Sequence, residues 1–241
     1  MTQNNCKLSV NINKIATLRN SRGGNTPSVT EAAKRIQGFG AHGITIHPRP
    51  DERHIRYQDA RDLKDVVYTE YNIEGNPQHN FIDLVLECKP TQVTLVPDAI
   101  GALTSNAGWD TVRNKEYLKE VIDEFKRNGI RTSIFVDPVL EMIEGAKETG
   151  TDRIELYTEA FAHEYGLGNK DGILPYVTAA KLANELDLGI NAGHDLSLDN
   201  IQFFNQNIPG LLEVSIGHAL ISESLYLGLE NVVNMYLQKL K

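Results

Sequence analysis

The sequence has too few cysteines for a disulfide-stabilised or zinc-binding protein. Only Cys6 and Cys88 occur among its 241 residues, far apart and without the spacing of metal ligands. No apolar run approaches the roughly 20 residues that a membrane-spanning helix needs. The first seven residues are polar, so no signal peptide is expected. These absences predict a cytoplasmic protein that does not bind a membrane.

Positive charge is also scarce, since 24 Lys and Arg stand against 32 Asp and Glu and the formal net charge is −8. Broad nucleic-acid binding needs a basic face that neutralises phosphates, so we expect no nucleic-acid partner. Any phosphate that this protein binds should be small and held locally.

What the sequence does contain is a repeated alternation of short apolar runs and helical segments. The runs predicted as strands are residues 7–12, 43–47, 66–74, 92–97, 131–137, 153–158, 189–194 and 213–218. Helices are predicted at 28–39, around 81–88, and at 114–128, 138–149, 174–186 and 198–206, with terminal helices running to residue 241. The stretch between the sixth strand and residue 174 is predicted as a polar loop.

Eight strands followed by helical segments predict a (β/α)₈ TIM barrel with additional helices, in one domain that spans residues 1–241. An open doubly wound sheet also alternates, but it usually has fewer strands and, when it binds a dinucleotide, a G-x-G-x-x-G turn. That turn is absent, because Gly23-Gly24 and Gly166-Leu167-Gly168 lack its spacing and its preceding strand.

Polar and titratable side chains follow the predicted strands at the ends where a barrel places its active site. Carboxyl ends of parallel strands meet at one rim, so we expect these side chains to converge on one cavity. They are Asn11, Asn13, Lys14, His47, Arg49, Glu74, Thr104, Ser105, Asp137, Glu155, His194 and His218. Each histidine alone could be a structural residue, and Glu74 or Glu155 alone could be a salt-bridged carboxylate at the rim. Their recurrence favours an active site.

The seventh and eighth strand ends also carry the features of a phosphate site. Residues 192–195 and 216–219 each combine a glycine with a histidine, and glycine lets backbone N–H groups approach an anion at a helix N-terminus. A metal held by the strand-end histidines with Glu74 is the rival interpretation. No H-x-x-x-H pair supports it, and Lys14, Arg49 and Arg53 would repel a cation, so we predict no metal.

The chain resembles the pyridoxine 5′-phosphate synthase family over nearly its whole length. The segments that carry the resemblance are residues 11–22, 44–54, 72–74, 95–97, 191–194 and 216–219. The family is a cytoplasmic (β/α)₈ barrel, usually a homo-octamer built from dimers. The resemblance implies an enzyme that condenses 1-deoxy-D-xylulose 5-phosphate with 3-amino-2-oxopropyl phosphate. The products are pyridoxine 5′-phosphate, inorganic phosphate and water, and no cofactor is needed.

The resemblance also implies roles for individual residues. His47 matches an acid/base residue, Glu74 a general base, His194 a proton donor, and Glu155 a carboxylate that stabilises charged intermediates. The positions that match contacts to the deoxyxylulose phosphate are Arg49, His54 and Thr104, and those that match contacts to the aminoketone phosphate are Asn11, Arg22, Gly217 and His218.

Two departures from the family's best-known form alter this expectation. The chain has Asn13-Lys14 where that form has Asp-His, and Asp195 where it has Gly. Asn13 and Lys14 are therefore predicted to bind substrate, as is Asp195, and not to carry protons. The long connection 98–110 is predicted to close over the site, with an ordinary surface loop as the alternative.

Two other functions stay open at this point. Another TIM-barrel aldolase or isomerase with a phosphate substrate should carry a Schiff-base lysine at a strand end, and Lys14 is the only candidate. A non-catalytic barrel that binds a vitamin B6 precursor should have lost a proton-transfer residue. His47, Glu74 and His194 are all present.

Overall fold

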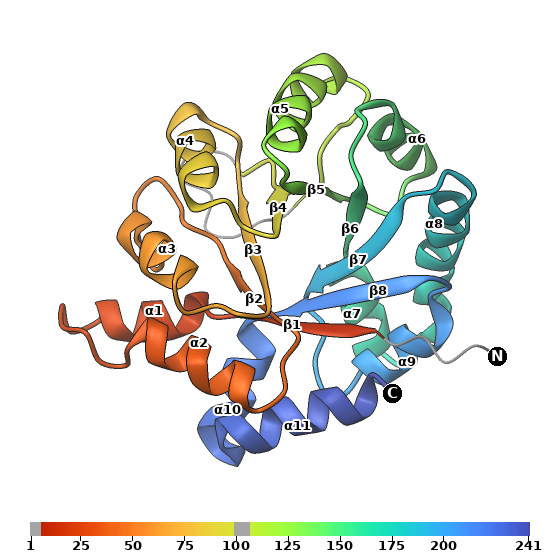
Figure 1. Cartoon of the computed structure of the whole chain (residues 1–241). Coiled ribbons are helices and arrows are strands. Elements are labelled where there is room, and N and C mark those ends of the chain that lie inside the picture. Colours follow the sequence, from red (N-terminus) through yellow and green to blue (C-terminus); the bar gives the residue numbers. More distant parts are fainter. Residues whose placement is uncertain (1–5, 99–106) are drawn as a thin grey trace.

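The computed structural model describes residues 6–98 and 107–241, which form a closed barrel of eight parallel strands surrounded by helices (Figure 1). The strands pair in chain order, and the last pairs with the first. The predicted (β/α)₈ TIM barrel is therefore confirmed. No helix within these residues is long and apolar enough to cross a membrane.

The strands are short, as expected of a parallel barrel. They are β1 (Lys7–Asn11), β2 (Gly43–Ile46), β3 (Glu70–Gly75), β4 (Gln92–Leu95), β5 (Arg131–Val136), β6 (Arg153–Tyr157), β7 (Gly189–His194) and β8 (Leu211–Ile216). The helices are α1 (Asn13–Asn20), α2 (Val29–Gly38), α3 (Tyr57–Lys64), α4 (His79–Cys88), α5 (Lys115–Arg127), α6 (Leu140–Glu148), α7 (Glu159–Gly166), α8 (Leu174–Glu185), α9 (Ile201–Asn207), α10 (His218–Leu227) and α11 (Leu229–Lys239), with a 3₁₀ turn at Lys170–Ile173.

Three helices were not predicted, and each buries too few apolar side chains to show a clear period. In α1 the buried residues are Ala16 and Arg19, and α7, which lies in the stretch predicted as a polar loop, buries only Phe161. The third, α3, is also short and largely charged. Sequence periodicity detects a helix by its apolar face, so a helix that buries an arginine escapes it.

The third strand was predicted to begin at residue 66 but begins at Glu70. The backbone N–H groups of Tyr68 and Thr69 donate to the side-chain Oε1 of Gln37 on α2, at 2.8 and 3.1 Å. A side chain has therefore replaced the neighbouring strand as the partner of the Tyr68 and Thr69 backbone amides. The eighth strand begins at Leu211, two residues earlier than predicted.

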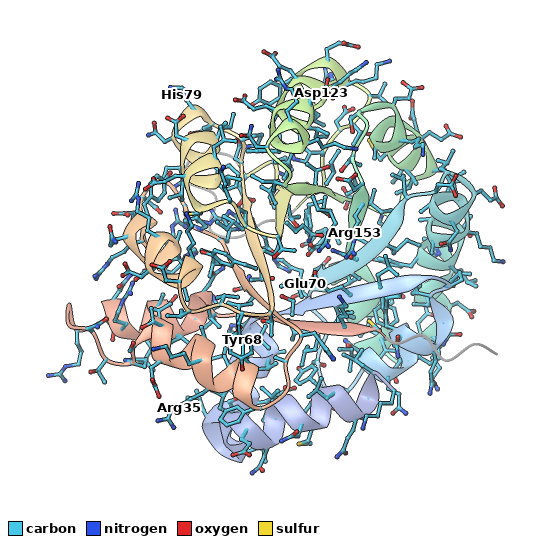
Figure 2. All side chains as sticks on the ribbon, viewed as in Figure 1. Arg35, Tyr68, Glu70, His79, Asp123 and Arg153 are labelled. Atoms are coloured by element: carbon cyan, nitrogen blue, oxygen red, sulfur yellow. The ribbon has the colours of Figure 1, made fainter. Side chains whose placement is uncertain are left out.

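The inside of the barrel is polar, because alternate residues of each strand point inward and most of these are hydrophilic. Bonds between strands that are not neighbours cross the interior: Asn191 Nδ2 donates to Gln92 Oε1 at 3.5 Å, and Ser215 Oγ to Glu74 Oε1 at 3.4 Å. The intervening residues, such as Ile44 and Val214, are fully buried and point outward toward the helices. In Figure 2, Glu70 lies near the barrel centre while His79 and Asp123 lie on peripheral helices.

One buried ion pair ties α1 to α3 beside the loop that follows β2. Arg19 is 1% exposed, and its guanidinium donates to both carboxylate oxygens of Asp59 and, at 3.1 Å, to the backbone oxygen of His54. Asp59 also accepts the backbone N–H of Arg56 at 2.7 Å, which secures the start of α3. The pair thereby holds the His54 segment against the barrel rim.

Asp59→Ala leaves the Arg19 guanidinium buried without its counter-charge, so we expect the free energy of unfolding to fall by roughly 3–5 kcal/mol. Urea denaturation followed by circular dichroism measures this change. The control is Glu31→Ala, which removes the partner of Arg35 in an exposed pair within α2. That variant should lose no more than about 0.5 kcal/mol. Equal losses in the two variants would contradict a special role for Arg19.

Candidate functional site

A cavity of about 490 Å³ lies at the carboxyl ends of the strands, and it gathers most of the predicted site residues. It is lined by Asn11, Asn13, Lys14, Thr17, His47, Arg49, Arg53, His54, Glu74, Val96, Phe135, Glu155, His194, Asp195, Ser215, Gly217 and His218. Arg22 does not line it and lies exposed in the turn after α1. Thr104, with most of the predicted closing loop, lies outside the described residues.

Two carboxyl groups lie in the floor of this cavity, and both favour the protonated form. Glu74 on β3 has a pKa raised well above its usual value, first by burial and then by the charge of Glu155. Burial, followed by the charge of Glu213, raises the pKa of Glu155 on β6 to about 8. Asn11 Nδ2 donates to Glu74 Oε2 at 3.4 Å. At neutral pH these two carboxyl groups therefore carry protons that they can donate.

A glycine provides the space for one of these carboxyls. A Cβ built on Gly193 of β7 would collide with the Oε1 atom of Glu155, and would lie 3.1 Å from the backbone oxygen of Ser215. Gly193 was predicted as part of an anion cradle. In the structure its lack of a side chain lets Glu155 lie against the neighbouring strand.

His47 follows β2 directly and sits beside both carboxyl and cationic groups. Its Nδ1 is 4.0 Å from Glu74 Oε2, and its Nε2 is 3.3 Å from Asp98 Oδ2. Burial and then the charge of Arg49 lower its pKa to about 3. The carboxylate of Asp98 does not offset this lowering of the pKa, because the guanidinium of Arg49 already compensates its charge. A neutral imidazole that can accept a proton thus lies next to a carboxyl that holds one.

Asn13 has a positioning contact that the sequence did not reveal. Its side-chain Oδ1 accepts the backbone N–H of His47 at 2.9 Å, while its own backbone N–H donates to Asn11 Oδ1 at 3.0 Å. These contacts need only a hydrogen-bond acceptor, so an amide serves here without the charge of an aspartate. The amide of Asn13 is therefore sufficient to hold the backbone of His47.

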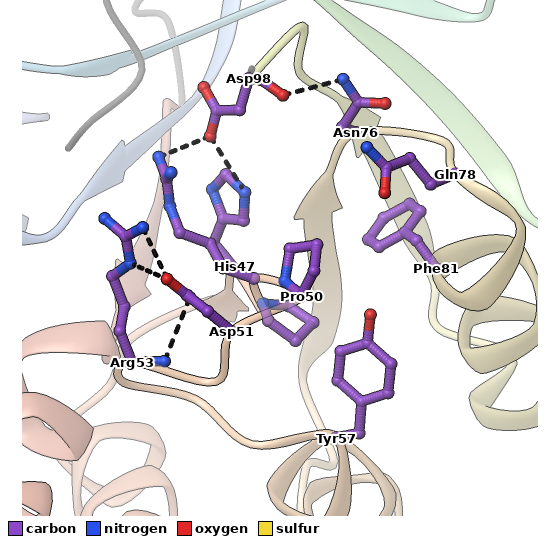
Figure 3. A pocket seen from close by; sticks show the side chains of 11 residues that line it. His47, Pro50, Asp51, Arg53, Tyr57, Asn76, Gln78, Phe81 and Asp98 are labelled. Atoms are coloured by element: carbon purple, nitrogen blue, oxygen red, sulfur yellow. Dashed lines mark hydrogen bonds and ion pairs between the residues drawn. The ribbon is translucent and has the colours of Figure 1, made fainter. Parts of the chain in front are cut away.

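Asp98 is a residue of this region that sequence reasoning missed. Its Oδ2 accepts from Arg49 Nη2 at 2.6 Å, and Asn76 Nδ2 donates to its backbone oxygen at 3.0 Å (Figure 3). The Arg49 and Asp98 side chains are only 7% and 9% exposed. A carboxylate one residue after Pro97, at the end of a strand, was the available signal.

His54 is prepared to donate a hydrogen bond into the cavity. Its Nδ1 accepts the backbone N–H of Ile55 at 2.9 Å, so the proton of the neutral ring resides on Nε2. Burial and the charge of His47 lower its pKa to about 3, which keeps the ring neutral. A neutral N–H donor beside Arg49 suits an anionic group.

His194 ends β7 in an unusual backbone conformation, with φ of +97°. Its ring packs edge-on against Tyr157 at a centroid distance of 5.0 Å and lies 6.4 Å from Phe135. Its Nδ1 pairs with the carboxylate of Asp195. That contact favours the tautomer with the proton on Nδ1 and leaves Nε2 as an acceptor. Asp195, predicted to bind substrate, thus also contacts a proposed proton carrier.

The opposite wall of the cavity contains the N-terminus of α10. Gly217 is the N-cap of this helix and His218 its first residue, so free backbone N–H groups lie at the cavity wall. A Cβ on Gly217 would lie 3.1 Å from the Cβ of Asn11. Lys14 lines the same cavity. The helix dipole, open amides and a lysine are the elements of an anion site.

Metal ligation finds no support in the part of the chain that the structure describes. Among residues 6–98 and 107–241, no three or more His, Cys, Asp or Glu side chains are grouped so that they could hold an ion.

Solved structures with low sequence identity share the fold. Phosphoribosylanthranilate isomerase of Thermotoga maritima matches with a TM-score of 0.60 at 13% identity, covering 98% of each chain. Thiamine phosphate pyrophosphorylase of Pyrococcus furiosus matches with a TM-score of 0.65 at 13% identity, covering all of this chain and 98% of that one. At such identities only the barrel architecture is shared.

Proteins with high identity match over almost the full length. The pyridoxine 5′-phosphate synthase of Flavobacterium johnsoniae is 85% identical over 235 residues, which cover 98% of this chain and 99% of that protein. The enzyme of the same name from Cytophaga hutchinsonii is 60% identical over the same shares. The model of the family described as pyridoxal phosphate biosynthesis protein PdxJ matches residues 8–241. The chain therefore belongs to the PdxJ family of pyridoxal phosphate biosynthesis proteins.

Proposed function

We propose that the protein is a pyridoxine 5′-phosphate synthase, which condenses 1-deoxy-D-xylulose 5-phosphate with 3-amino-2-oxopropyl phosphate. The observation that carries the proposal is the single cavity in which His47, Glu74, Glu155 and His194 lie between two candidate anion sites. Two phosphate esters and several proton transfers need this combination of groups. The relatives of the same name, at up to 85% identity over 98% of the chain, support it.

The two phosphates would anchor the substrates at different walls. Arg49 and the Nε2–H of His54 are proposed to hold the deoxyxylulose phosphate, with Thr104 as a further contact. The N-terminus of α10 at Gly217 and His218, with Asn11 and Lys14, is proposed to hold the aminoketone phosphate, and Arg22 stays a predicted contact for it. Binding both ends fixes the amine of one substrate near the ketone of the other, which lowers the entropic barrier to imine formation.

The proton carriers would act in the steps after imine formation. Glu74 holds its proton because burial raises its pKa. A positively charged imine next to it would lower that pKa and release a carboxylate, which can then remove a proton as general base. His47 is neutral and can take up a proton. His194 is proposed to take up a proton at Nε2 in an earlier step and then to deliver it to a leaving hydroxyl. Glu155 would stabilise positive intermediates once ionised.

The proposal includes no cofactor and no metal, because imine formation, phosphate elimination, ring closure and loss of water need only proton transfer. We also propose a cytoplasmic homo-octamer built from dimers. Apolar side chains are exposed at the end of α10, where Leu225 and Tyr226 are 73% and 88% accessible, and an assembly would cover such residues. A barrel aldolase is less well supported, since Lys14 lies on α1, next to the proposed phosphate site.

Incubating the purified protein with both phosphates should produce pyridoxine 5′-phosphate, measured by the absorbance of the pyridinol. Glu74→Gln keeps the shape of the side chain and removes the base, so we expect product formation to fall by at least about 10². Binding of each substrate, followed by calorimetry, should persist in this variant. Turnover at the wild-type rate in Glu74→Gln, or no product from the wild type, would refute the assignment.

If the two phosphates bind at separate sites, a substitution at one site should weaken the binding of only one substrate. Arg49→Ala removes a charge-assisted contact, so affinity for deoxyxylulose phosphate should weaken by roughly 1.5–3 kcal/mol, with little effect on the aminoketone phosphate. Gly217→Val places a side chain against Asn11 at the start of α10 and should weaken the aminoketone phosphate instead. Calorimetric titration of each variant with each substrate tests both. If each variant lost affinity for the other substrate, the two sites would have to be exchanged.

The buried carboxyl of Glu155 should make stability depend on pH. Its pKa is about 8 in the folded protein against 4.5 as the ordinary value, so the folded state holds more protons between these values. This contribution to stability is complete below pH 4.5 and is lost as pH rises through 8. The lowered pKa values of His47 and His54 change the stability only at pH values below 6.5, their ordinary pKa.

Between pH 7 and 8.5 we therefore expect the wild type to lose stability relative to Glu155→Gln by about 1 kcal/mol. Urea denaturation of both proteins at the two pH values measures the difference. Glu155→Gln keeps the neighbouring titratable groups, including Glu213. The difference between the two proteins therefore isolates the contribution of Glu155. Parallel pH profiles would show that Glu155 is already ionised at pH 7.

A further inference from the structure

We propose that Asp98 is a built-in competitor of the substrate's phosphate, which occupies the anion-binding position of Arg49 until the phosphate displaces it. The inference rests on the proposed function insofar as Arg49 receives a phosphate ester. It assigns to Asp98 control of affinity and of the release of His47, neither of which follows from the roles proposed above.

The contacts of Asp98 are concentrated on one oxygen. Oδ2 accepts from Arg49 Nη2 at 2.6 Å and lies 3.3 Å from His47 Nε2. The arginine proposed to bind substrate and the histidine proposed to move protons are thus engaged by the same atom. Figure 3 shows this carboxylate beside His47, with the main chain of Asp98 tied to Asn76.

Burial explains why Arg49 needs such a carboxylate. The Arg49 side chain is 7% exposed, and a guanidinium at that depth without a counter-charge is strongly unfavourable. Asp98 supplies this counter-charge and holds the guanidinium group of Arg49 in position. A phosphate that binds the same guanidinium group would then lie against the Asp98 carboxylate. Two anions in contact at low dielectric repel strongly. Phosphate and Asp98 therefore exclude one another at Arg49.

The structure also provides a place for the displaced carboxylate. A second cavity of about 70 Å³ adjoins Asp98 and is lined in part by Asn76 and Gln78, whose amide groups can donate to it. The backbone oxygen of Asp98 is held by Asn76, and the N–H of Val96 donates to Gly75 at 2.9 Å. Rotation of the side chain alone therefore suffices. It frees Arg49 for the phosphate and His47 Nε2 for chemistry in a single event.

Calorimetric titration of the full-length protein with 1-deoxy-D-xylulose 5-phosphate, and separately with inorganic phosphate, tests the proposal. Asp98→Asn keeps the shape and removes the charge, so the dissociation constant for both anions should fall by at least about tenfold. Asp98→Glu restores a carboxylate and should return the constants toward wild-type values. In turnover, KM for the sugar phosphate should change by a larger factor than kcat.

The matched control is Asp51→Asn, which removes the same charge from a carboxylate paired with Arg53, 2.6 Å from its Nη2, on the loop after β2. If Asp51→Asn tightens phosphate binding as much as Asp98→Asn does, the effect is a general change in charge, and the proposal is wrong. A second control is the Arg49→Ala background, where removing the charge of Asp98 should no longer tighten binding, because the competition requires Arg49.

Unchanged dissociation constants in Asp98→Asn, or a kcat loss of tenfold or more with unchanged KM, would also overturn the proposal. The second result would make Asp98 a partner of His47 during the reaction. These outcomes are distinct from failure of the proposed function, which is read from the wild type alone as absence of product. Binding of inorganic phosphate reports on Asp98 whether or not product forms.

Discussion

The pairing of β8 with β1 is the contact on which the remaining geometry depends. It joins Lys7 to Glu213 and Val10 to Ile216 in parallel register, and so closes the sheet. Closure forces alternate residues of every strand into one narrow interior. Because those residues are mostly polar, the interior becomes a hydrogen-bonded network, and its upper layer delivers Glu74 and Glu155 to the cavity.

This interior sets the charge state of the site. Carboxyl groups on separate strands share a buried interior, so their pKa values are raised first by burial and then by a neighbouring charge, Glu155 for Glu74 and Glu213 for Glu155. The same burial keeps His47 neutral. Acids that hold protons and a base that lacks one are thus placed side by side. Because these buried carboxyl groups must lose their protons as pH rises, the folded protein becomes less stable. Perturbed pKa values of this kind are common in active sites built from buried titratable groups.

Small and neutral residues control the fine geometry. Gly193 leaves the space that Glu155 occupies, and the Asn13 amide holds the backbone of His47. At the rim, Asp98 compensates the buried charge of Arg49. None of these three residues needs to touch substrate to matter, since each determines where a reactive group lies or when it is available.

The sequence by itself determined the barrel, because strand and helix periods are local and eight of them leave few other closed arrangements. It also predicted that polar strand-end residues meet in the cavity, since the parallel barrel brings every carboxyl end to one rim, although Asp137 does not line it. Helices α1, α3 and α7 were not predicted from the sequence, because their buried faces contain too few apolar side chains. The start of β3 was misplaced, because a side chain of α2 competes for its amides. Only the tertiary structure shows that Arg22 does not line the cavity, that Asp195 pairs with His194, and that Asp98 forms an ion pair with Arg49. Arg49 and Asp98 are 49 residues apart, and even adjacent side chains such as His194 and Asp195 meet only if the backbone turns them together. A linear pattern records which side chains are present but not which of them meet.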